Sequence, residues 1–267
     1  MEKQITTSLQ RSHLCWNITT KCNQSCRFCH RITNKQELPF EDNLRILIYL
    51  KDQGIKKITW TGGEALLYPG LATLLKCSAE FNIRNNLISN GQVFSEMKKE
   101  DIIKVLRNVD EITLSLDAVD DEINGIMGRS NTQYENVIKI VEIVRSVYPE
   151  KSIKINTVAS KINFKEVVKV GQYLQHIALT RWKIFMFNPL RGAAKKNDKM
   201  FEISEAEFEK LKTEITSINL PFNVYFYTKD MIEDDYSLIL ADGTIVNTKE
   251  GVDYVEGSLC SVNLYNW

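Results

Sequence analysis

The chain has 267 residues and carries 34 lysines and arginines against 34 aspartates and glutamates. With 43% apolar and 25% charged residues it is long enough to bury a large core, and this composition excludes wholesale disorder. The zero net charge argues against a nucleic-acid partner bound through bulk positive charge, and no apolar run reaches the roughly 20 residues of a membrane span. Because the first residues also lack the apolar segment of a signal peptide, we expect a cytoplasmic protein without a membrane partner.

Short strand-like runs alternate with longer helix-like runs along most of the chain. The predicted strands are His13–Thr19, Lys56–Thr61, Arg84–Ser89, Glu111–Asp117, Ile153–Val158 and Thr180–Phe187. The predicted helices are Phe40–Gln53, Gly70–Phe81, Met97–Arg107, Tyr134–Val147, Phe164–His176 and Ser204–Ser217, the last opened by a capping box. This alternation predicts parallel βαβ units in a partial (βα)6 barrel or an open sheet with helices outside.

The pattern changes after the sixth strand, and this change divides the chain in two. Residues 1–187 are the predicted barrel, and residues 188–267 are a predicted C-terminal α+β extension that covers its mouth. The run Lys195–Lys199 within the extension is predicted to be a solvated loop, with closure over the substrate as an alternative.

Polar residues alternate with apolar ones in these strands, although parallel strands covered on both faces are usually apolar throughout. The residues that share a polar face within their strands are Lys57, Thr59 and Thr61; Ser115 and Asp117; Lys154 and Asn156; and Arg181 and Lys183. Since unpaired buried charge is costly, a polar inner face predicts a wet cavity. Four of these residues are cations, which favours a pocket for a phosphorylated ligand. The alternative is that the lysines lie at strand ends and extend to solvent.

Three of the six cysteines fall within eight residues, in the segment Cys22-Asn-Gln-Ser-Cys26-Arg-Phe-Cys29. In a chain without a secretion signal, metal or redox chemistry explains such a cluster better than disulfides do. A zinc site would need a fourth ligand, and no neighbouring residue clearly supplies it. Three thiolates on a 4Fe–4S cluster instead leave one iron open to a small molecule. The remaining cysteines, Cys15, Cys77 and Cys260, stand alone and are expected to be ordinary buried residues.

The cysteine spacing, directly after a strand, resembles that of the radical S-adenosylmethionine (SAM) superfamily. The resemblance continues at Thr61-Gly-Gly-Glu64, Ser89-Asn-Gly91 and Ser115-Leu-Asp117, which end the second, third and fourth predicted strands. It implies that Cys22, Cys26 and Cys29 hold a 4Fe–4S cluster. It further implies that SAM is bound by Gly62, Gly63, Glu64, Asn90, Ser115 and Asp117. In one departure from the family pattern, Ala65 stands where a proline usually follows the glutamate.

Other segments resemble viperin-like enzymes, a radical SAM family that modifies nucleotides. They are Lys57–Glu64, Ile126-Met-Gly-Arg129, Ile153-Lys-Ile-Asn156, Arg181-Trp-Lys-Ile-Phe185 and Tyr236–Gly243, and the chain ends in Trp267 as those enzymes end in tryptophan. The resemblance implies that a nucleoside triphosphate is bound by Lys57, Arg129, Lys154, Asn156, Arg181 and Lys183.

The same resemblance implies a reaction and its partners. A 5′-deoxyadenosyl radical would remove the ribose 4′ hydrogen, the 3′ hydroxyl would leave as water, and Tyr236 would return a hydrogen. The product would be a 3′-deoxy-3′,4′-didehydro nucleotide made from CTP, UTP or GTP, with a role in antiviral defence. The implied partners are an external electron donor of the flavodoxin or ferredoxin type and the iron–sulfur assembly machinery.

Two other functions remain open at this point. The first is a radical SAM enzyme of another class, which modifies peptides or cyclises a nucleotide toward molybdopterin, although such enzymes carry further C-terminal cysteines. The second is a non-catalytic iron–sulfur protein. It would explain the three cysteines but not the Gly-Gly-Glu segment or the cationic strands.

Overall fold

The computed structural model describes residues 12–232, 237–249 and 252–259. The described strands form one ten-stranded sheet in the order β10-β9-β8-β1-β2-β3-β4-β5-β6-β7. Their bounds are β1 His13–Asn17, β2 Lys57–Thr61, β3 Arg84–Ser89, β4 Glu111–Ser115, β5 Ser152–Ala159, β6 Arg181–Met186, β7 Asn223–Tyr227, β8 Ser237–Ile239, β9 Thr244–Lys249 and β10 Val252–Ser258. Neighbours from β8 through β1 to β7 pair in parallel, and β9 and β10 are antiparallel. The six predicted strands thus form the centre of this open, curved sheet.

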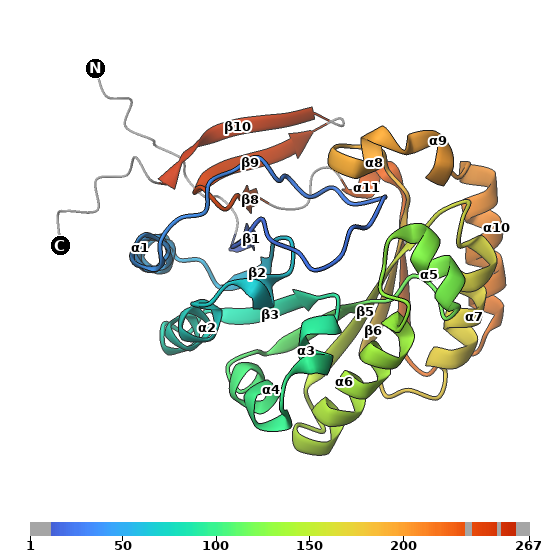
Figure 1. The fold of residues 1–267 in the computed structure, drawn as a ribbon, viewed down its shortest axis with the longest axis horizontal. Coiled ribbons are helices and arrows are strands. Elements are labelled where there is room, and N and C mark those ends of the chain that lie inside the picture. The colour runs from blue at the N-terminus through green and yellow to red at the C-terminus, as the bar shows by residue number, and fades with distance from the viewer. Residues whose placement is uncertain (1–11, 233–236, 250–251, 260–267) are drawn as a thin grey trace.

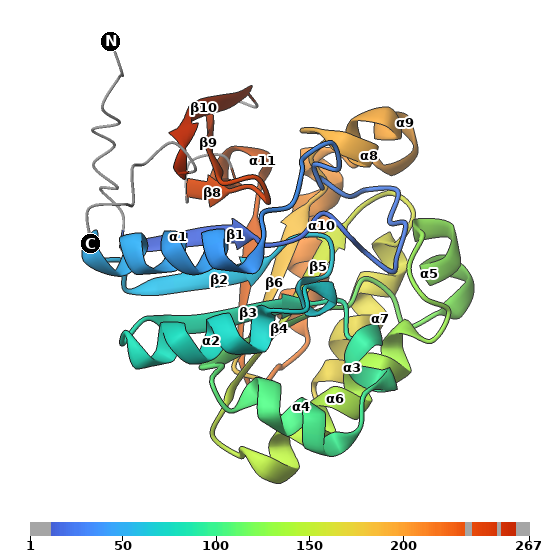
Figure 2. The same ribbon diagram turned by 60° about the vertical axis from the view of Figure 1, so that its left-hand side comes forward.

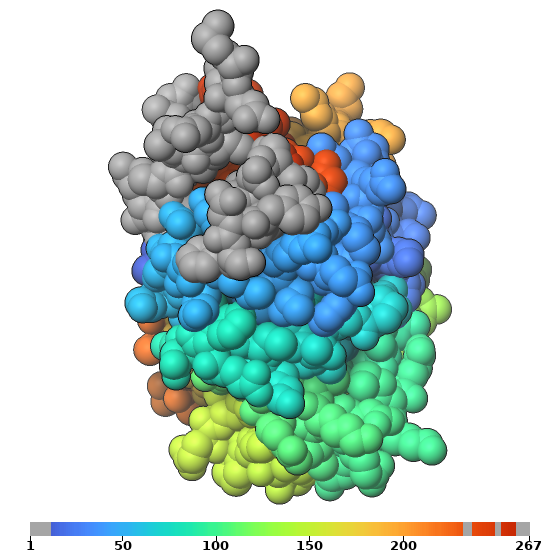
Figure 3. All heavy atoms as spheres, turned by 90° about the vertical axis from the view of Figure 1, so that its left-hand side faces the viewer, coloured from blue at the N-terminus to red at the C-terminus, as the bar shows by residue number. Residues whose placement is uncertain are grey.

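The helices of the βα units cover the outer, convex face of the sheet (Figures 1 and 2). In chain order the helices are α1 Phe40–Asp52, the 3₁₀ turn η1 Ala65–Leu67, α2 Leu71–Glu80, α3 Gln92–Glu96, α4 Lys99–Leu106, α5 Asp121–Met127, α6 Gln133–Val147, α7 Phe164–Leu174, α8 Gly192–Lys196, α9 Asp198–Phe201, α10 Glu205–Ser217 and α11 Lys229–Ile232. Seen from outside, successive βα units form stacked bands (Figure 3). The predicted capping box of Ser204 and Glu207 opens α10.

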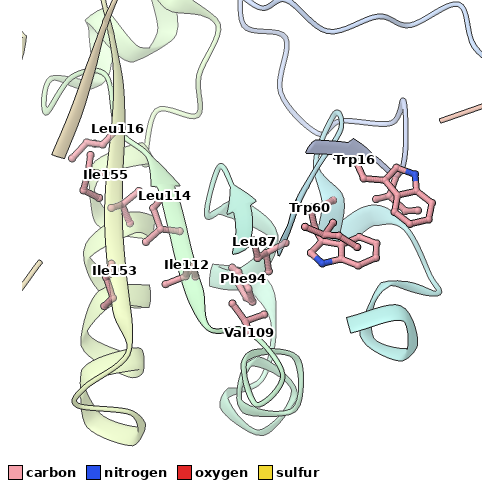
Figure 4. Packing of buried hydrophobic residues seen from close by; sticks show 14 of the residues in the cluster. Trp16, Trp60, Leu87, Phe94, Val109, Ile112, Leu114, Leu116, Ile153 and Ile155 are labelled. Atoms are coloured by element: carbon pink, nitrogen blue, oxygen red, sulfur yellow. The ribbon is translucent and has the colours of Figure 1, made fainter. Parts of the chain in front are cut away.

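The apolar half of each strand's alternation packs between sheet and helices (Figure 4). Trp16 of β1 stacks on Trp60 of β2 with ring centroids 5.2 Å apart. Both indoles are fully buried, as are Leu114 of β4 and Ile155 of β5. Because this face is apolar, the period-two alternation directs the polar residues to the concave face, where a site can form.

The C-terminal part adds strands to both sides of the central six. β7 pairs with β6, whereas β8 pairs with β1 and is followed by the β9–β10 hairpin. Residues 195–199 lie in and between the short helices α8 and α9, so the prediction of a loop there was wrong, whereas Lys195, Lys196 and Lys199 are exposed as predicted. None of the helices formed by the described residues combines the length and apolarity that crossing a bilayer requires.

Candidate active site

Backbone hydrogen bonds from the end of β2 hold the start of the loop that carries the three clustered cysteines. The amides of Gly63 and Glu64 donate to the carbonyls of Thr19 and Lys21, each at 2.8 Å. The approach is close because Gly63 has no side chain. A Cβ at Gly63 would lie 2.0 Å from the Lys21 oxygen and 3.0 Å from the Cβ of Cys22. The second glycine of the Gly-Gly-Glu segment therefore has a steric reason to be glycine.

Two segments that follow later in the chain form hydrogen bonds with the rest of this loop. Gly128, which ends α5 at φ +82°, accepts a hydrogen bond from the Ser25 amide at 3.3 Å. A Cβ on Gly128 would lie 2.3 Å from the Ser25 oxygen. On the other side, the amide of Ala194 in α8 donates to the Cys29 carbonyl at 3.2 Å. The cysteine loop is thus held between β2, α5 and α8, and Figure 2 shows this dark-blue segment running between α5 and α8.

The three thiols have surroundings that suit an iron–sulfur cluster. Cys22, Cys26 and Cys29 are free and partly buried. Backbone amides point at two of the sulfurs, with Gln24 N 3.5 Å from Cys22 Sγ and Arg31 N 3.3 Å from Cys29 Sγ. Burial raises the pKa of Cys22, and it raises the pKa of Cys26 to about 11. Partly buried thiols, two of which accept N–H hydrogen bonds, fit a cluster held by three cysteines.

The described residues contain no group of His, Cys, Asp or Glu side chains arranged to hold a single metal ion.

The Glu64 side chain binds backbone amides at the strand ends next to this loop. Its buried carboxylate accepts hydrogen bonds from the amides of Asn90 at 2.8 Å and Leu66 at 3.3 Å. Burial raises the pKa of Glu64, and these donors act in the opposite direction. With its side chain capping η1, the turn forms at Ala65 without a proline. All of the predicted SAM residues end or follow β2, β3 and β4, so they lie at the carboxyl ends of neighbouring strands. They are Gly62, Gly63, Glu64, Asn90, Ser115 and Asp117.

Asp117 and Arg129 form a buried ion pair beside the cysteine loop. The Arg129 Nε donates to Asp117 Oδ2 at 2.7 Å, and the other carboxylate oxygen accepts from the Val158 amide at 2.7 Å. The guanidinium also donates to Gln24 at 3.2 Å and lies 5.1 Å from the centre of the Phe28 ring. Burial alone would lower the pKa of Arg129, but Asp117 raises it above its ordinary value. The structure therefore places Arg129 against the cysteine loop, apart from the lysines with which it was grouped.

Gln133 is a site residue that the sequence analysis missed. It is fully buried at the start of α6, and its amide nitrogen donates to the carbonyls of Asn90 and Ser115, both at 2.7 Å. Its oxygen accepts from Gln24 at 2.8 Å, which ties the cysteine loop to the ends of β3 and β4. A glutamine at a helix start is usually solvated, so the sequence offered no signal for this role.

The inner faces of the central strands enclose a cavity of about 230 Å³. Its polar lining includes Lys57, Lys154, Asn156 and Lys183, as the strand alternation predicted. The other lining residues are His13, Cys15, Thr59, Asn86, Ile88, Thr113, Phe185, Tyr227 and Met231. The Lys183 ammonium lies 4.7 Å from the centre of the Tyr227 ring. The Oδ1 atom of Asn156 is buried and has no hydrogen-bond partner among the described residues.

Arg181 lies near this cavity but not in its lining. Its guanidinium is 6.0 Å from the centre of the Tyr225 ring, which is 43% exposed. Arg181 pairs in register with Lys154, one layer toward the amino ends of the strands from Lys183. The structure thus brings three of the five predicted cations into one cavity and leaves Arg181 at its outer end.

Glu111 is a second residue that the sequence analysis missed. Its carboxylate lies 3.3 Å from the Lys57 ammonium and contacts that of Lys154, and it accepts from Ser152 Oγ at 3.3 Å. Burial opposes ionisation, but the two lysines hold the pKa of Glu111 below its ordinary value. The signal was present, because Glu111 alternates in phase with Ser115 in the same strand and so belongs to the polar face.

A second cavity, of about 240 Å³, adjoins the cysteine loop. It is lined by Cys15, Asn17, Cys29, His30, Arg31, Thr61, Gly62, Ile88, Leu190, Arg191, Leu238 and Thr248. Cys15 and Ile88 line both cavities, so the cationic cavity and the cluster-side cavity meet at these two residues. Tyr236, the predicted hydrogen donor, lies outside the described residues, as do Cys260 and Trp267.

Comparison with known proteins agrees with this geometry. A family profile described as the radical SAM superfamily matches residues 16–174. An "S-adenosylmethionine-dependent nucleotide dehydratase" of Flammeovirga pacifica is 30% identical over 199 residues, which cover 71% of this chain and 67% of that protein. A relative with the same description from Lacinutrix mariniflava is 27% identical over 198 residues, which cover 70% of this chain and 40% of that protein.

Among solved structures, the crystal structure of Streptococcus suis SuiB bound to S-adenosylmethionine matches with a TM-score of 0.72 at 19% identity. The match covers 96% of this chain and 65% of that one. A likeness at this level of identity concerns the fold alone, and it confirms the predicted partial-barrel class. This chain spans about two thirds or less of each of these three proteins.

Proposed function

This chain belongs to the radical SAM superfamily, and from that premise we propose that it is a nucleotide dehydratase that acts on a nucleoside triphosphate. Enzymes of this superfamily use a 4Fe–4S cluster and SAM. The observation that carries the proposal is the cavity lined by Lys57, Lys154 and Lys183, which meets the cluster-side cavity at Cys15 and Ile88. A strongly anionic substrate bound there would have its nonphosphorylated end next to the place where SAM is expected.

The residues that would hold the cofactors are those of the cysteine loop and of the adjoining strand ends. Cys22, Cys26 and Cys29 would bind the cluster, and the backbone around Gly62 and Asn90 would bind SAM. When bound, the two groups supply a 5′-deoxyadenosyl radical that removes a hydrogen from an unactivated carbon. The chain's own part is to hold these groups apart from bulk water, and the buried anchoring of the cysteine loop supports that role.

The substrate would be gripped at its phosphates. Ammonium groups form strong charge-assisted contacts with phosphate oxygens, and the three lysines come from β2, β5 and β6, so they surround a ligand in the cavity. The unpartnered Oδ1 of Asn156 would accept a hydrogen bond from a ribose hydroxyl. Arg181 would extend the phosphate site toward its outer end. By the family resemblance Arg129 would also bind the phosphates, although it lines neither cavity.

The finer details of the reaction come from the family resemblance. The 4′ hydrogen of the ribose would be abstracted, the 3′ hydroxyl would leave as water, and Tyr236 would return a hydrogen. A 3′-deoxy-3′,4′-didehydro product of CTP, UTP or GTP lacks the hydroxyl that a polymerase extends, which would serve antiviral defence. We place the enzyme in the cytoplasm, with residues 188–267 covering the mouth of the barrel. It would work with a flavodoxin- or ferredoxin-type electron donor and the iron–sulfur assembly machinery.

The test is an anaerobic assay of SAM cleavage. The chain is reconstituted with iron and sulfide, reduced with dithionite, and incubated with SAM and each of CTP, UTP, GTP and ATP. We expect one triphosphate to stimulate 5′-deoxyadenosine formation and to lose the mass of one water in the mass spectrum. Cleavage that is indifferent to all four would contradict the proposal, and peptides would then be the next substrates to examine.

A further inference from the structure

Glu111 lies behind the phosphate-binding lysines, outside the cavity that they line. Glu111 is 4% exposed and is absent from the cavity lining, whereas Lys57 and Lys154 belong to it. One carboxylate oxygen faces both ammonium groups, and Ser152 donates to the other. The three ion-pair partners come from β2, β4 and β5, so the carboxylate joins strands that are not all adjacent.

We propose that Glu111 is a positioning residue that holds the Lys154 and Lys57 ammonium groups in place to meet the nucleotide's phosphates before the substrate arrives. This inference rests on the proposed function and deepens it. Its chemical content is that a triphosphate meets a Lys154 ammonium group that already carries its proton. Without the carboxylate, binding would have to bring a proton with it.

Lys154 depends most on this carboxylate, because its side chain is only 6% exposed. The titratable and charged groups around it, inside the cavity and beside it, are His13 on β1, Lys57 on β2, Glu111 on β4, Arg181 and Lys183 on β6, and Tyr227 on β7. Within this set Glu111 is the carboxylate, and Lys57 and Arg181 both disfavour a further positive charge.

Burial and the Glu111 carboxylate act on the pKa of Lys154 in opposite directions. Burial lowers the pKa of Lys154 to about 8, even though Glu111 acts to raise it. An opposite charge in contact with an ionisable group shifts its pKa by about 1–3. Loss of the Glu111 carboxylate would therefore lower the pKa of Lys154 to about neutral or below. A lysine that is neutral in the free enzyme must then take up a proton when a phosphate binds.

Calorimetry of nucleotide binding measures that proton directly. The reconstituted enzyme with SAM, left unreduced so that no turnover occurs, is titrated with CTP, UTP, GTP and ATP in turn. Each titration is repeated in two buffers of different ionisation enthalpy, at pH 6, 7 and 8. The variants are Glu111→Gln, Glu111→Asp, which keeps the charge, and Ser152→Ala, which removes the carboxylate's other partner and leaves both ion pairs.

Wild type and Glu111→Gln should differ clearly in the number of protons taken up with the nucleotide. With a pKa of about 8, wild-type Lys154 should take up about 0.1 proton at pH 7, and Glu111→Asp and Ser152→Ala should behave alike. Glu111→Gln should take up about 0.5–1 proton at pH 7, and its affinity should fall about 5- to 10-fold from pH 7 to pH 8. Protonation of the nucleotide's own terminal phosphate is common to all variants. The difference in proton uptake between the variants therefore comes from the residues around the cavity.

The outcomes of the titrations distinguish failure of this inference from failure of the proposed function. Proton uptake and pH dependence in Glu111→Gln that equal those of wild type would overturn the inference and leave the proposed function standing. If wild type binds none of the four triphosphates, the proposed function fails and the inference fails with it. The double variant Glu111→Gln/Lys154→Met removes both buried charges together and serves if the single variant does not fold. Uptake near one proton in this double variant would show that Lys154 is not the group involved.

Discussion

Replacing Gly63 by alanine should loosen the cysteine loop, because the new methyl group would occupy the space of the loop's backbone. The Cβ would lie 2.0 Å from the Lys21 oxygen, far inside the separation that real Cβ atoms show. Relief requires the strand end and the loop to part by more than about 1 Å, which breaks the two 2.8 Å hydrogen bonds donated by Gly63 and Glu64. At a net 0.5–1.5 kcal/mol each, their loss should lower the free energy of unfolding by about 1–3 kcal/mol.

The matched control is Gly54→Ala, which has nothing within 4 Å of its Cβ but a φ of +77°. It should cost about 1–2 kcal/mol through the backbone alone and leave the loop intact. The assays are urea unfolding of the chain before reconstitution, and iron and sulfide content per chain after it. We expect Gly63→Ala to incorporate much less iron than Gly54→Ala at similar stability. Equal iron content in the two variants, or a Gly63→Ala chain as stable as wild type, would refute the steric reasoning.

Four further substitutions test other parts of the site. Cys26→Ala should abolish cluster assembly and SAM cleavage, measured by iron content and 5′-deoxyadenosine; retained cleavage would exclude Cys26 as a ligand. Arg129→Ala leaves the Asp117 carboxylate buried and unpaired, so denaturant unfolding should show a loss of about 3–5 kcal/mol, and a loss below 1 kcal/mol would contradict the buried pair. Lys183→Ala should keep the cluster and weaken nucleotide-stimulated cleavage by about 10- to 150-fold in apparent affinity, for a charged contact of 1.5–3 kcal/mol. Tyr236→Phe should uncouple SAM cleavage from formation of the dehydrated nucleotide, and an unchanged product yield would remove Tyr236 from the mechanism.

The arrangement of the cavity follows from strand parity, which a sequence displays directly. Lys57, Lys154 and Lys183 were placed on an inner face by alternation alone, and the structure brings them around one cavity. Their role in phosphate binding stays a prediction. The same parity includes Glu111, whose position was visible but whose partners were not. Alternation tells which face a side chain is on and says nothing about which neighbouring strand it meets.

Helices shorter than two turns were the elements that sequence patterns missed. α3, α5, α8 and α9 contain four to seven residues each, too few for a helical period to be recognised. They matter here because Gly128 at the end of α5 and Ala194 in α8 hold the cysteine loop. Tertiary contacts stabilise such helices, so local patterns carry little information about them.

By itself, the sequence determined the order of βα units, the cysteine spacing and the inward position of the lysines, because each of these depends on residues close together in the chain. Only the tertiary structure decided that Arg129 pairs with Asp117 beside the cysteine loop and that Glu111 joins two lysines from other strands. Those pairings depend on strand register and on where a loop returns to the sheet. A buried charge is stable only beside the partner that folding brings to it, and that partner is not its neighbour in the sequence.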